Sequence, residues 1–172
     1  MTLFIGIDPG HSGGIASIEG DTIHLYKMPQ VEGHLVEIFE IFSRHACIAF
    51  IEKQGARPAY APDPNNPGQT MIVQGVTSTW TFAEQYGLLR GVLAAFKIPR
   101  EFIAPRDWQK GLGIPPKRKN PKESQTEWKN RLKQKACELY PRLKITLATA
   151  DALLIAHYCM ERHDTLGTWD EL

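Results

Sequence analysis

Three acidic residues, far apart in the chain, lie where packing alone does not explain a charge. Asp8 follows the apolar run LFIGI, Glu52 follows ACIAFI, and Asp151 lies inside ATADALLIA. Burying an unpaired charge costs far more than local packing returns, so each carboxylate needs a cation or a hydrogen-bond donor. If the three meet, their mutual repulsion calls for a metal, and hard oxygen ligands favour Mg²⁺ or Mn²⁺ over zinc.

The chemistry that suits such a site is phosphodiester hydrolysis. Two ions about 3.5–4 Å apart can activate a water and hold the departing oxygen during in-line displacement. Each acid also has a structural interpretation: Asp8 as a turn residue, Glu52 as a surface charge at a strand end, and Asp151 as a helix cap. The cap would require a helix that begins after Ala150, against the helical run that starts at Ala148. Taken together, the three acids favour the metal site.

The first half of the chain predicts the strands that would position two of these acids. Residues 3–8, 15–19 and 22–26 are apolar or alternating runs separated by glycine-containing turns, which indicates a three-stranded antiparallel meander. A helix is expected around residues 31–42. Residues 46–51 then predict a second buried strand, after which Glu52 follows at once.

The second half predicts a long loop and then mostly helices. Residues 54–77 hold four prolines and an Asn-Asn pair, so we expect a loop without regular structure over most of that length. The remaining expected elements are a helix from residue 78 or 79 to before Pro99, a strand at 102–104, a short helix containing Trp108, a loop at 111–121, and helices at 125–139 and 148–162. We assign Trp80 and Trp108 to the core.

Length and composition indicate a single domain, residues 1–172, because 172 residues with 42% hydrophobic content can bury one core. No run approaches the roughly 18 apolar residues of a membrane span, and the N-terminus lacks a basic segment before a long apolar run. We therefore expect no membrane partner and a cytoplasmic location. Three cysteines without ligand spacing predict neither a disulfide framework nor a zinc site.

Basic residues are concentrated in one region, although the net charge is only +1. Residues 106–135 hold ten lysines and arginines against three acidic residues. Two interpretations stay open for this region: an ordinary solvated surface, or a surface that follows nucleic-acid phosphates.

Three motifs, in this order, resemble those of RuvC-type Holliday junction resolvases, most closely the short phage and bacterial members. FIGIDPGHSGGIASI (4–18) is similar to the opening motif of the family, IEKQ (51–54) to its second acidic motif, and ADALLIAHY (150–158) to its C-terminal Asp-Ala helix. The resemblance implies an α/β fold of the RNase H-like type. Its mixed five-stranded sheet has three antiparallel strands and then two parallel ones, flanked by helices.

The same resemblance implies a function in a bacterial cell or a phage-infected host. Members bind a four-way DNA junction as homodimers and make paired symmetric nicks, and a two-fold protein suits a two-fold junction. By this resemblance Asp8, Glu52 and Asp151 are ligands of Mg²⁺, with Mn²⁺ as a substitute and two ions per site. Lys129 is the best match to a catalytic lysine that the family places near the scissile phosphate, and Lys122 is the second.

The expected DNA contacts lie in the proline-rich loop and in the basic region. Arg57 and Tyr60 would reach the branch point of the junction, where an aromatic ring can stack on an unpaired base. The alternative is that this loop is a plain connector. The basic region would contribute Lys117, Arg118, Lys119 and Lys122. We expect the helix at 78–97 to form the dimer contact.

Ala148 departs from the family pattern, which places Asp or His one helical turn before the last Asp. Thr149 and His157 are near in sequence, but neither falls on the same helical face as cleanly.

Alternative functions are a less selective nuclease acting on flaps, single strands or RNA hybrids, and a non-catalytic junction-binding protein. GIDPG also resembles the phosphate loop of actin-like kinases and ATPases, which need two such domains, so we expect no nucleotide cofactor.

Overall fold

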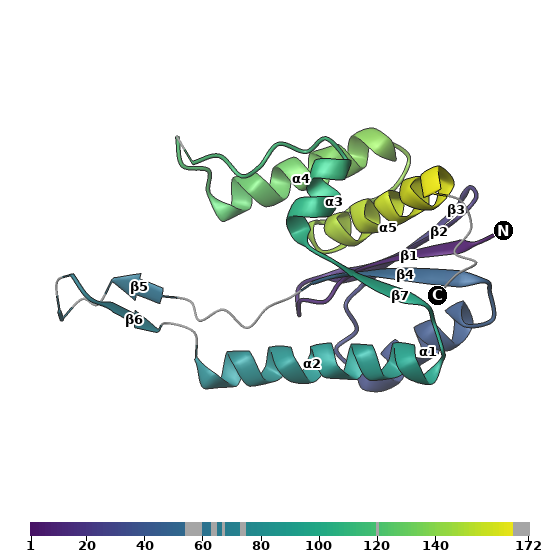
Figure 1. Ribbon diagram of the computed structural model, residues 1–172, viewed down its shortest axis with the longest axis horizontal. Coiled ribbons are helices and arrows are strands. Elements are labelled where there is room, and N and C mark those ends of the chain that lie inside the picture. The colour runs from purple at the N-terminus through teal and green to yellow at the C-terminus, as the bar shows by residue number, and fades with distance from the viewer. Residues whose placement is uncertain (54–59, 63–64, 67, 73–74, 120, 167–172) are drawn as a thin grey trace.

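A five-stranded sheet forms the centre of the computed structural model, which describes residues 1–53, 60–62, 65–66, 68–72, 75–119 and 121–166 (Figure 1). Its strands are β1 (Leu3–Asp8), β2 (Gly14–Glu19), β3 (Thr22–Lys27), β4 (Cys47–Glu52) and β7 (Arg100–Ile103). They lie in the order β3-β2-β1-β4-β7. The first three strands are antiparallel, whereas β4 runs parallel to β1 and β7 parallel to β4. The predicted mixed α/β sheet is therefore confirmed.

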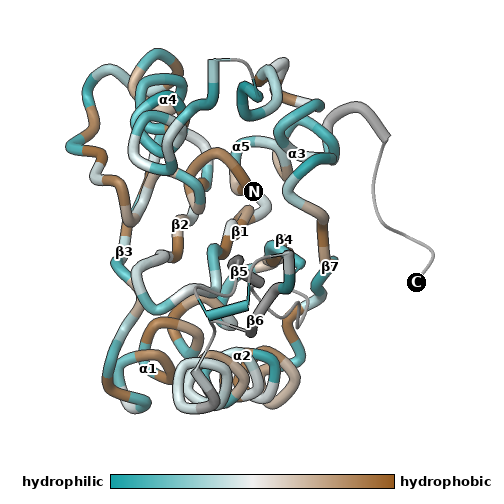
Figure 2. Tube along the Cα trace, turned by 90° about the vertical axis from the view of Figure 1, so that its left-hand side faces the viewer, coloured by the Kyte–Doolittle hydropathy of each residue, from teal (hydrophilic) through white to brown (hydrophobic). Residues whose placement is uncertain are grey.

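Helices cover both faces of this sheet, giving three layers (Figures 1 and 2). One face carries α3 (Pro105–Gly111), α4 (Gln125–Leu139) and α5 (Leu147–Leu166). The opposite face carries α1 (Glu32–Phe42) and α2 (Val76–Ala95). Since both faces are covered, all six residues of β1 are buried, as a central strand requires.

Side chains that alternate between the two faces of the sheet divide the core in two and determine which face the acids at the strand ends occupy. Phe4 and Phe50 belong to the cluster on the α5 side, and Ile5 and Ile51 belong to the cluster on the α1 and α2 side. Successive side chains of a strand point to opposite faces. Asp8, four residues after Phe4, and Glu52, two after Phe50, consequently share the α5 side of the sheet.

Side-chain caps explain where the two long helices of that face begin. The Ser124 hydroxyl accepts from the backbone N–H of Glu127, whose carboxylate accepts from the N–H of Ser124, so α4 starts with a full capping box. At α5 the Thr149 hydroxyl accepts from the N–H of Thr146 at 3.1 Å. The helix thus begins at Leu147, one residue before the predicted start, and Asp151 is not its cap.

The predicted loop at 54–77 includes a short hairpin among its described residues. Residues Tyr60–Pro62 (β5) and Thr70–Ile72 (β6) pair as a short antiparallel hairpin outside the main sheet, and α2 begins at Val76. Short paired strands of this kind can include a proline at an edge, which composition does not reveal.

One of the two tryptophans assigned to the core is exposed. Trp108 is fully buried, as predicted, but Trp80 is 69% exposed, so its assignment was wrong. A helix of 20 residues spans about 30 Å, whereas six-residue strands span about 20 Å. The first turns of α2 extend beyond the sheet that would bury them (Figure 1). In the described part of the chain, no helix is long and apolar enough to cross a membrane.

Candidate active site

Two of the three predicted acids are neighbours at the carboxyl edge of the sheet. β1 and β4 pair in parallel with Ile7 opposite Ile51. The next residues along, Asp8 and Glu52, therefore end the two strands side by side and face the same layer. Asp8 is 9% exposed, and a hydrogen bond of 3.4 Å from the N–H of Gly10 fixes one of its oxygens.

Helix α5 brings the third acid over the first because small residues let it lie directly on β1. A Cβ added at Gly6 would lie 2.1 Å from the carbonyl oxygen of Ala152 and 2.2 Å from the backbone nitrogen of Ala156. Only glycine permits so close an approach of helix and strand. Asp151, next to Ala152 in the chain, is thereby held 4% exposed above the strand ends.

Lys129 of α4 contacts two of the acids. Its ammonium donates to Oδ2 of Asp151 and lies 3.8 Å from Oδ2 of Asp8. The Lys129 side chain is 33% exposed, against 12% for Asp8 and 6% for Asp151. A single ammonium, reaching in from solvent, thus compensates part of the buried negative charge.

Trp108 of α3 orients the remaining acid. Its indole N–H donates to Oε2 of Glu52 at 3.0 Å, and its ring is fully buried in the core beside α5. A rigid aromatic side chain therefore fixes the direction of one carboxylate oxygen. Four elements, β1, β4, α3 and α5, with Lys129 from α4, together build this group of residues.

All three carboxyl groups have raised pKa values, as grouped and buried acids should. Burial is the largest cause each time. The charge of Asp151 further raises the pKa of Asp8, and the charge of Asp8 helps to raise the pKa of Glu52 to about 7. Lys129 opposes these effects, including at Asp151. Burial lowers the pKa of the Lys129 ammonium, but the carboxylates outweigh it and the net pKa is raised.

The donor atoms of the three acids fit a hard divalent cation. All are carboxylate oxygens, the ligands that Mg²⁺ and Mn²⁺ prefer. Oδ1 of Asp151 is buried and has no hydrogen-bond partner among the described residues. Among the described residues, however, no three acidic, histidine or cysteine side chains are placed so that together they could hold a metal ion. The cation beside Asp8 and Asp151 is instead the Lys129 ammonium.

No extra ligand appears where the family pattern would place one. Ala148 occupies that position in the first turn of α5. The hydroxyl of Thr149 is engaged with Thr146, and Nδ1 of His157 lies 2.7 Å from the Tyr140 hydroxyl. Both side chains therefore have partners away from the three acids.

The predicted DNA-contacting residues fall into three groups. Arg57 lies outside the described residues, and Tyr60 is described only in its backbone, within β5. Lys119 and Lys122 are exposed. Lys117 donates to Oε1 of Gln125 at 2.9 Å, and Arg118 is ion-paired, as described next. The four basic residues thus come from one short segment between α3 and α4.

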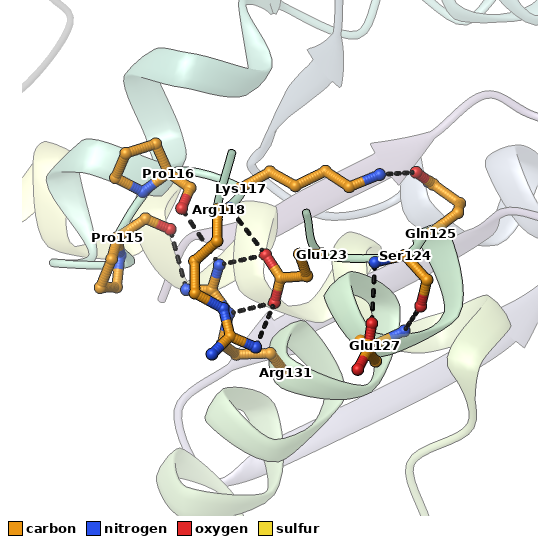
Figure 3. A network of polar contacts seen from close by, with 9 residues as sticks. All are labelled: Pro115, Pro116, Lys117, Arg118, Glu123, Ser124, Gln125, Glu127 and Arg131. Atoms are coloured by element: carbon orange, nitrogen blue, oxygen red, sulfur yellow. Dashed lines mark hydrogen bonds and ion pairs between the residues drawn. The ribbon is translucent and has the colours of Figure 1, made fainter. Parts of the chain in front are cut away.

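Glu123 is a buried acid that sequence reasoning missed. It is 2% exposed, and its carboxylate accepts from Nε and Nη2 of Arg131 at 3.0 and 2.9 Å and from the N–H of Arg118 at 2.9 Å (Figure 3). The hydrogen bonds from Arg131 are the main reason that its pKa falls to about 2. Nothing in the local pattern signals this, because Arg131 is eight residues away and Glu123 lies among lysines.

The architecture matches known structures although the sequence is remote. A structure of Thermus thermophilus RuvC in complex with a Holliday junction substrate aligns over 98% of this chain and 98% of that chain, with a TM-score of 0.58 and 15% identity. Another structure of Thermus thermophilus RuvC aligns over 96% and 97%, with a TM-score of 0.55 and 15% identity. No protein-family model matches the sequence, and no curated protein matches it. The chain has the RNase H-like fold of RuvC.

Proposed function

We propose that this chain is a single-domain, metal-dependent endonuclease that makes paired nicks in four-way DNA junctions. The observation that carries the proposal is the convergence of the buried Asp8 and Asp151 and the partly buried Glu52, from three separate elements, near one lysine. Such a cluster opposes folding, because the three acids are desolvated and repel one another. It is therefore better explained by chemistry than by packing. The RuvC fold supports this choice of chemistry.

In this proposal Asp8, Glu52 and Asp151 hold Mg²⁺, or Mn²⁺ in its place, with up to two ions per site. When bound, the metal would supply a water of lowered pKa and positive charge beside the phosphodiester. The Nζ atom of Lys129 donates to a non-bridging phosphate oxygen and stabilises the negative charge that develops there. The indole N–H of Trp108 keeps Oε2 of Glu52 in place.

We propose further that the protein acts as a homodimer joined through α2. The outward face of this helix exposes Trp80, and a Cβ added at Gly87 or Gly91 would meet no other atom within 4 Å. A second copy of α2 can approach closely over such small residues. A two-fold dimer would then present one active site to each of two symmetric strands.

A specific observation also favours a second candidate, a non-catalytic junction-binding protein. The Lys129 ammonium is ion-paired with Asp151, and the acids of the described residues form no complete ligand set. A lysine that stays in this place would exclude metal while keeping a basic surface for DNA.

Cleavage of defined substrates separates these candidates. A synthetic mobile four-way junction, a flap and an RNA–DNA hybrid are incubated with the protein and Mg²⁺, and the nicks are mapped. We expect paired symmetric nicks in the junction, none with Asp8→Asn, and wild-type cleavage with Asp21→Asn, a matched change in an exposed turn residue. Equal cleavage of all substrates would instead indicate a less selective nuclease. Tight junction binding without nicks would indicate the binding protein.

A further inference from the structure

A groove with a basic rim lies beside the candidate active site, between α3 and the segment that follows it. Its volume is about 720 Å³, within the range of about 300–1,000 Å³ typical of ligand clefts. Its lining includes Arg106, Gln109, Lys110, Ile114 and Trp128. A cleft of this size can take a short stretch of one nucleic-acid strand.

Helix α3 lies between this groove and Glu52: one face of the helix lines the groove, and the opposite face contacts Glu52. Arg106, Gln109 and Lys110 are three and four residues apart, which places them on one face of the helix. Trp108 lies on the opposite face, is fully buried, and donates to Glu52. One face of α3 therefore lines the groove, and the other contacts an acid of the candidate site.

The floor of the groove is fixed by the way α3 ends. Gly113 has a φ of +64°, its N–H donates to the carbonyl oxygen of Lys110, and the N–H of Ile114 donates to that of Gln109 at 2.8 Å. This is the Schellman arrangement that closes a helix with glycine in the left-handed region. Ile114 is 7% exposed and anchored in the core.

The far wall of the groove is clamped by Arg131. Its guanidinium donates to the carbonyl oxygens of Pro115 and Pro116 at 2.9 and 3.2 Å and to Glu123 (Figure 3). It also lies 4.4 Å from the ring centroid of Trp128. Arg131 is thus engaged in holding this wall. Trp128, which also lines the groove, precedes Lys129 of the candidate site in α4.

The two cationic side chains of α3 differ from Arg118 and Arg131 in having no acidic partner among the described residues. Arg106 and Lys110 are both exposed, and within the described ranges neither takes part in an ion pair. Arg118 and Arg131, by contrast, are neutralised by the buried Glu123. The charges of Arg106 and Lys110 on the α3 rim are therefore available to a partner.

We propose that this groove holds the sugar–phosphate backbone of the DNA strand that continues from the scissile phosphate. Arg106 and Lys110 would each contact a phosphate, while Ile114 and Trp128 offer an apolar floor to the deoxyribose. Charge complementarity favours this occupant over a duplex arm bound elsewhere, and so does α3, which lines the groove and also contacts Glu52. The inference rests on the proposed nuclease function, because it takes the position of the scissile phosphate from it.

Salt dependence of binding tests the phosphate contacts. The affinity of the full chain for a synthetic four-way junction is measured in EDTA, which prevents cleavage, over a series of salt concentrations. Each phosphate contact contributes about 0.7–0.9 to the slope of log affinity against log salt. For Arg106→Ala/Lys110→Ala we expect weaker binding and a slope reduced by about 1.4–1.8. Arg142→Ala/Lys144→Ala, an equal charge change at exposed residues away from the groove, should keep the wild-type slope.

An unchanged slope for the α3 double variant, or an equal reduction in both variants, would overturn the inference. All four residues are exposed, and thermal unfolding checks that the variants fold. Arg106→Glu provides a second variant with a larger expected loss of affinity.

Crosslinking then locates the strand. A photoreactive amino acid at Gln109 should crosslink to the cleaved strand within a few nucleotides of the mapped nick. Crosslinks only to a distant arm, or to no DNA strand, would contradict the assignment. If the wild type binds junctions with the predicted salt slope but never nicks them, the nuclease proposal fails while the groove remains a DNA-binding surface. If it nicks them without the α3 contacts, only the groove assignment fails.

Discussion

Glu52→Gln should stabilise the metal-free protein at alkaline pH while abolishing cleavage. The carboxyl pKa of Glu52 rises from its ordinary value of 4.5 to about 7, first through burial and then through Asp8. Since each pKa unit is worth about 1.4 kcal/mol, the ionised carboxylate opposes folding by at most about 3 kcal/mol. Glutamine removes that charge, and its amide oxygen can still accept from Trp108.

The pH dependence has a definite sign. A folded-state pKa above the unfolded one means that the folded protein binds more protons, so stability falls as pH rises from about 4.5 to about 7 and then levels off. The advantage of Glu52→Gln should therefore be about 3 kcal/mol at pH 8 and below about 1 kcal/mol at pH 5. For a chain of this length that is about 6–12 °C in Tm at pH 8.

Thermal and urea unfolding in EDTA at pH 5 and pH 8 measure this difference. Glu37→Gln, which removes the same charge from an exposed position of α1, serves as the control and should show no comparable gain. The reasoning is refuted if Glu52→Gln is no more stable than wild type at pH 8, or if its gain is the same at both pH values.

Three other changes test the same site and its supports. Lys129→Met should lower the single-turnover cleavage rate by about 10²–10³-fold, as loss of a transition-state donor does, while junction affinity in EDTA changes little; equal losses of both would contradict a catalytic role. Gly6→Ala should unfold the protein or displace α5, because the added Cβ would lie 2.1 Å from backbone, whereas Gly33→Ala, which meets open space, should leave Tm unchanged or slightly higher. Glu123→Gln should speed proteolysis between residues 115 and 123, since the clamp loses its charge-assisted hydrogen bonds, and a wild-type digestion rate would argue against the clamp.

The fold could be predicted largely because its strongest signals are local. Apolar runs that end in an acid marked β1 and β4, and the range predicted for α4, 125–139, matches the structure. Hydrophobic periodicity within each element does not depend on distant partners. It therefore survives in a sequence that shares only 15% identity with the similar structures.

The parts that escaped prediction depend on distant geometry. The exposure of Trp80 follows from the length of α2 relative to the strands, which no local pattern encodes. Glu123 is buried only because Arg131 folds back over it, and the indole of Trp108 meets Glu52 from 56 residues away. The acids themselves could be selected as residues that need a partner, and the structure brings them together. Their roles as metal ligands, and that of Lys129 in catalysis, stay predictions.

Binding of Mn²⁺, followed by electron paramagnetic resonance with junction DNA present, tests most directly whether the three acids form a cation site. We predict saturable binding to the wild-type protein, loss of that binding in Asp8→Asn and in Asp151→Asn, and wild-type binding in Asp21→Asn. Failure of the wild type to bind Mn²⁺, or undiminished binding after both site substitutions, would contradict the account.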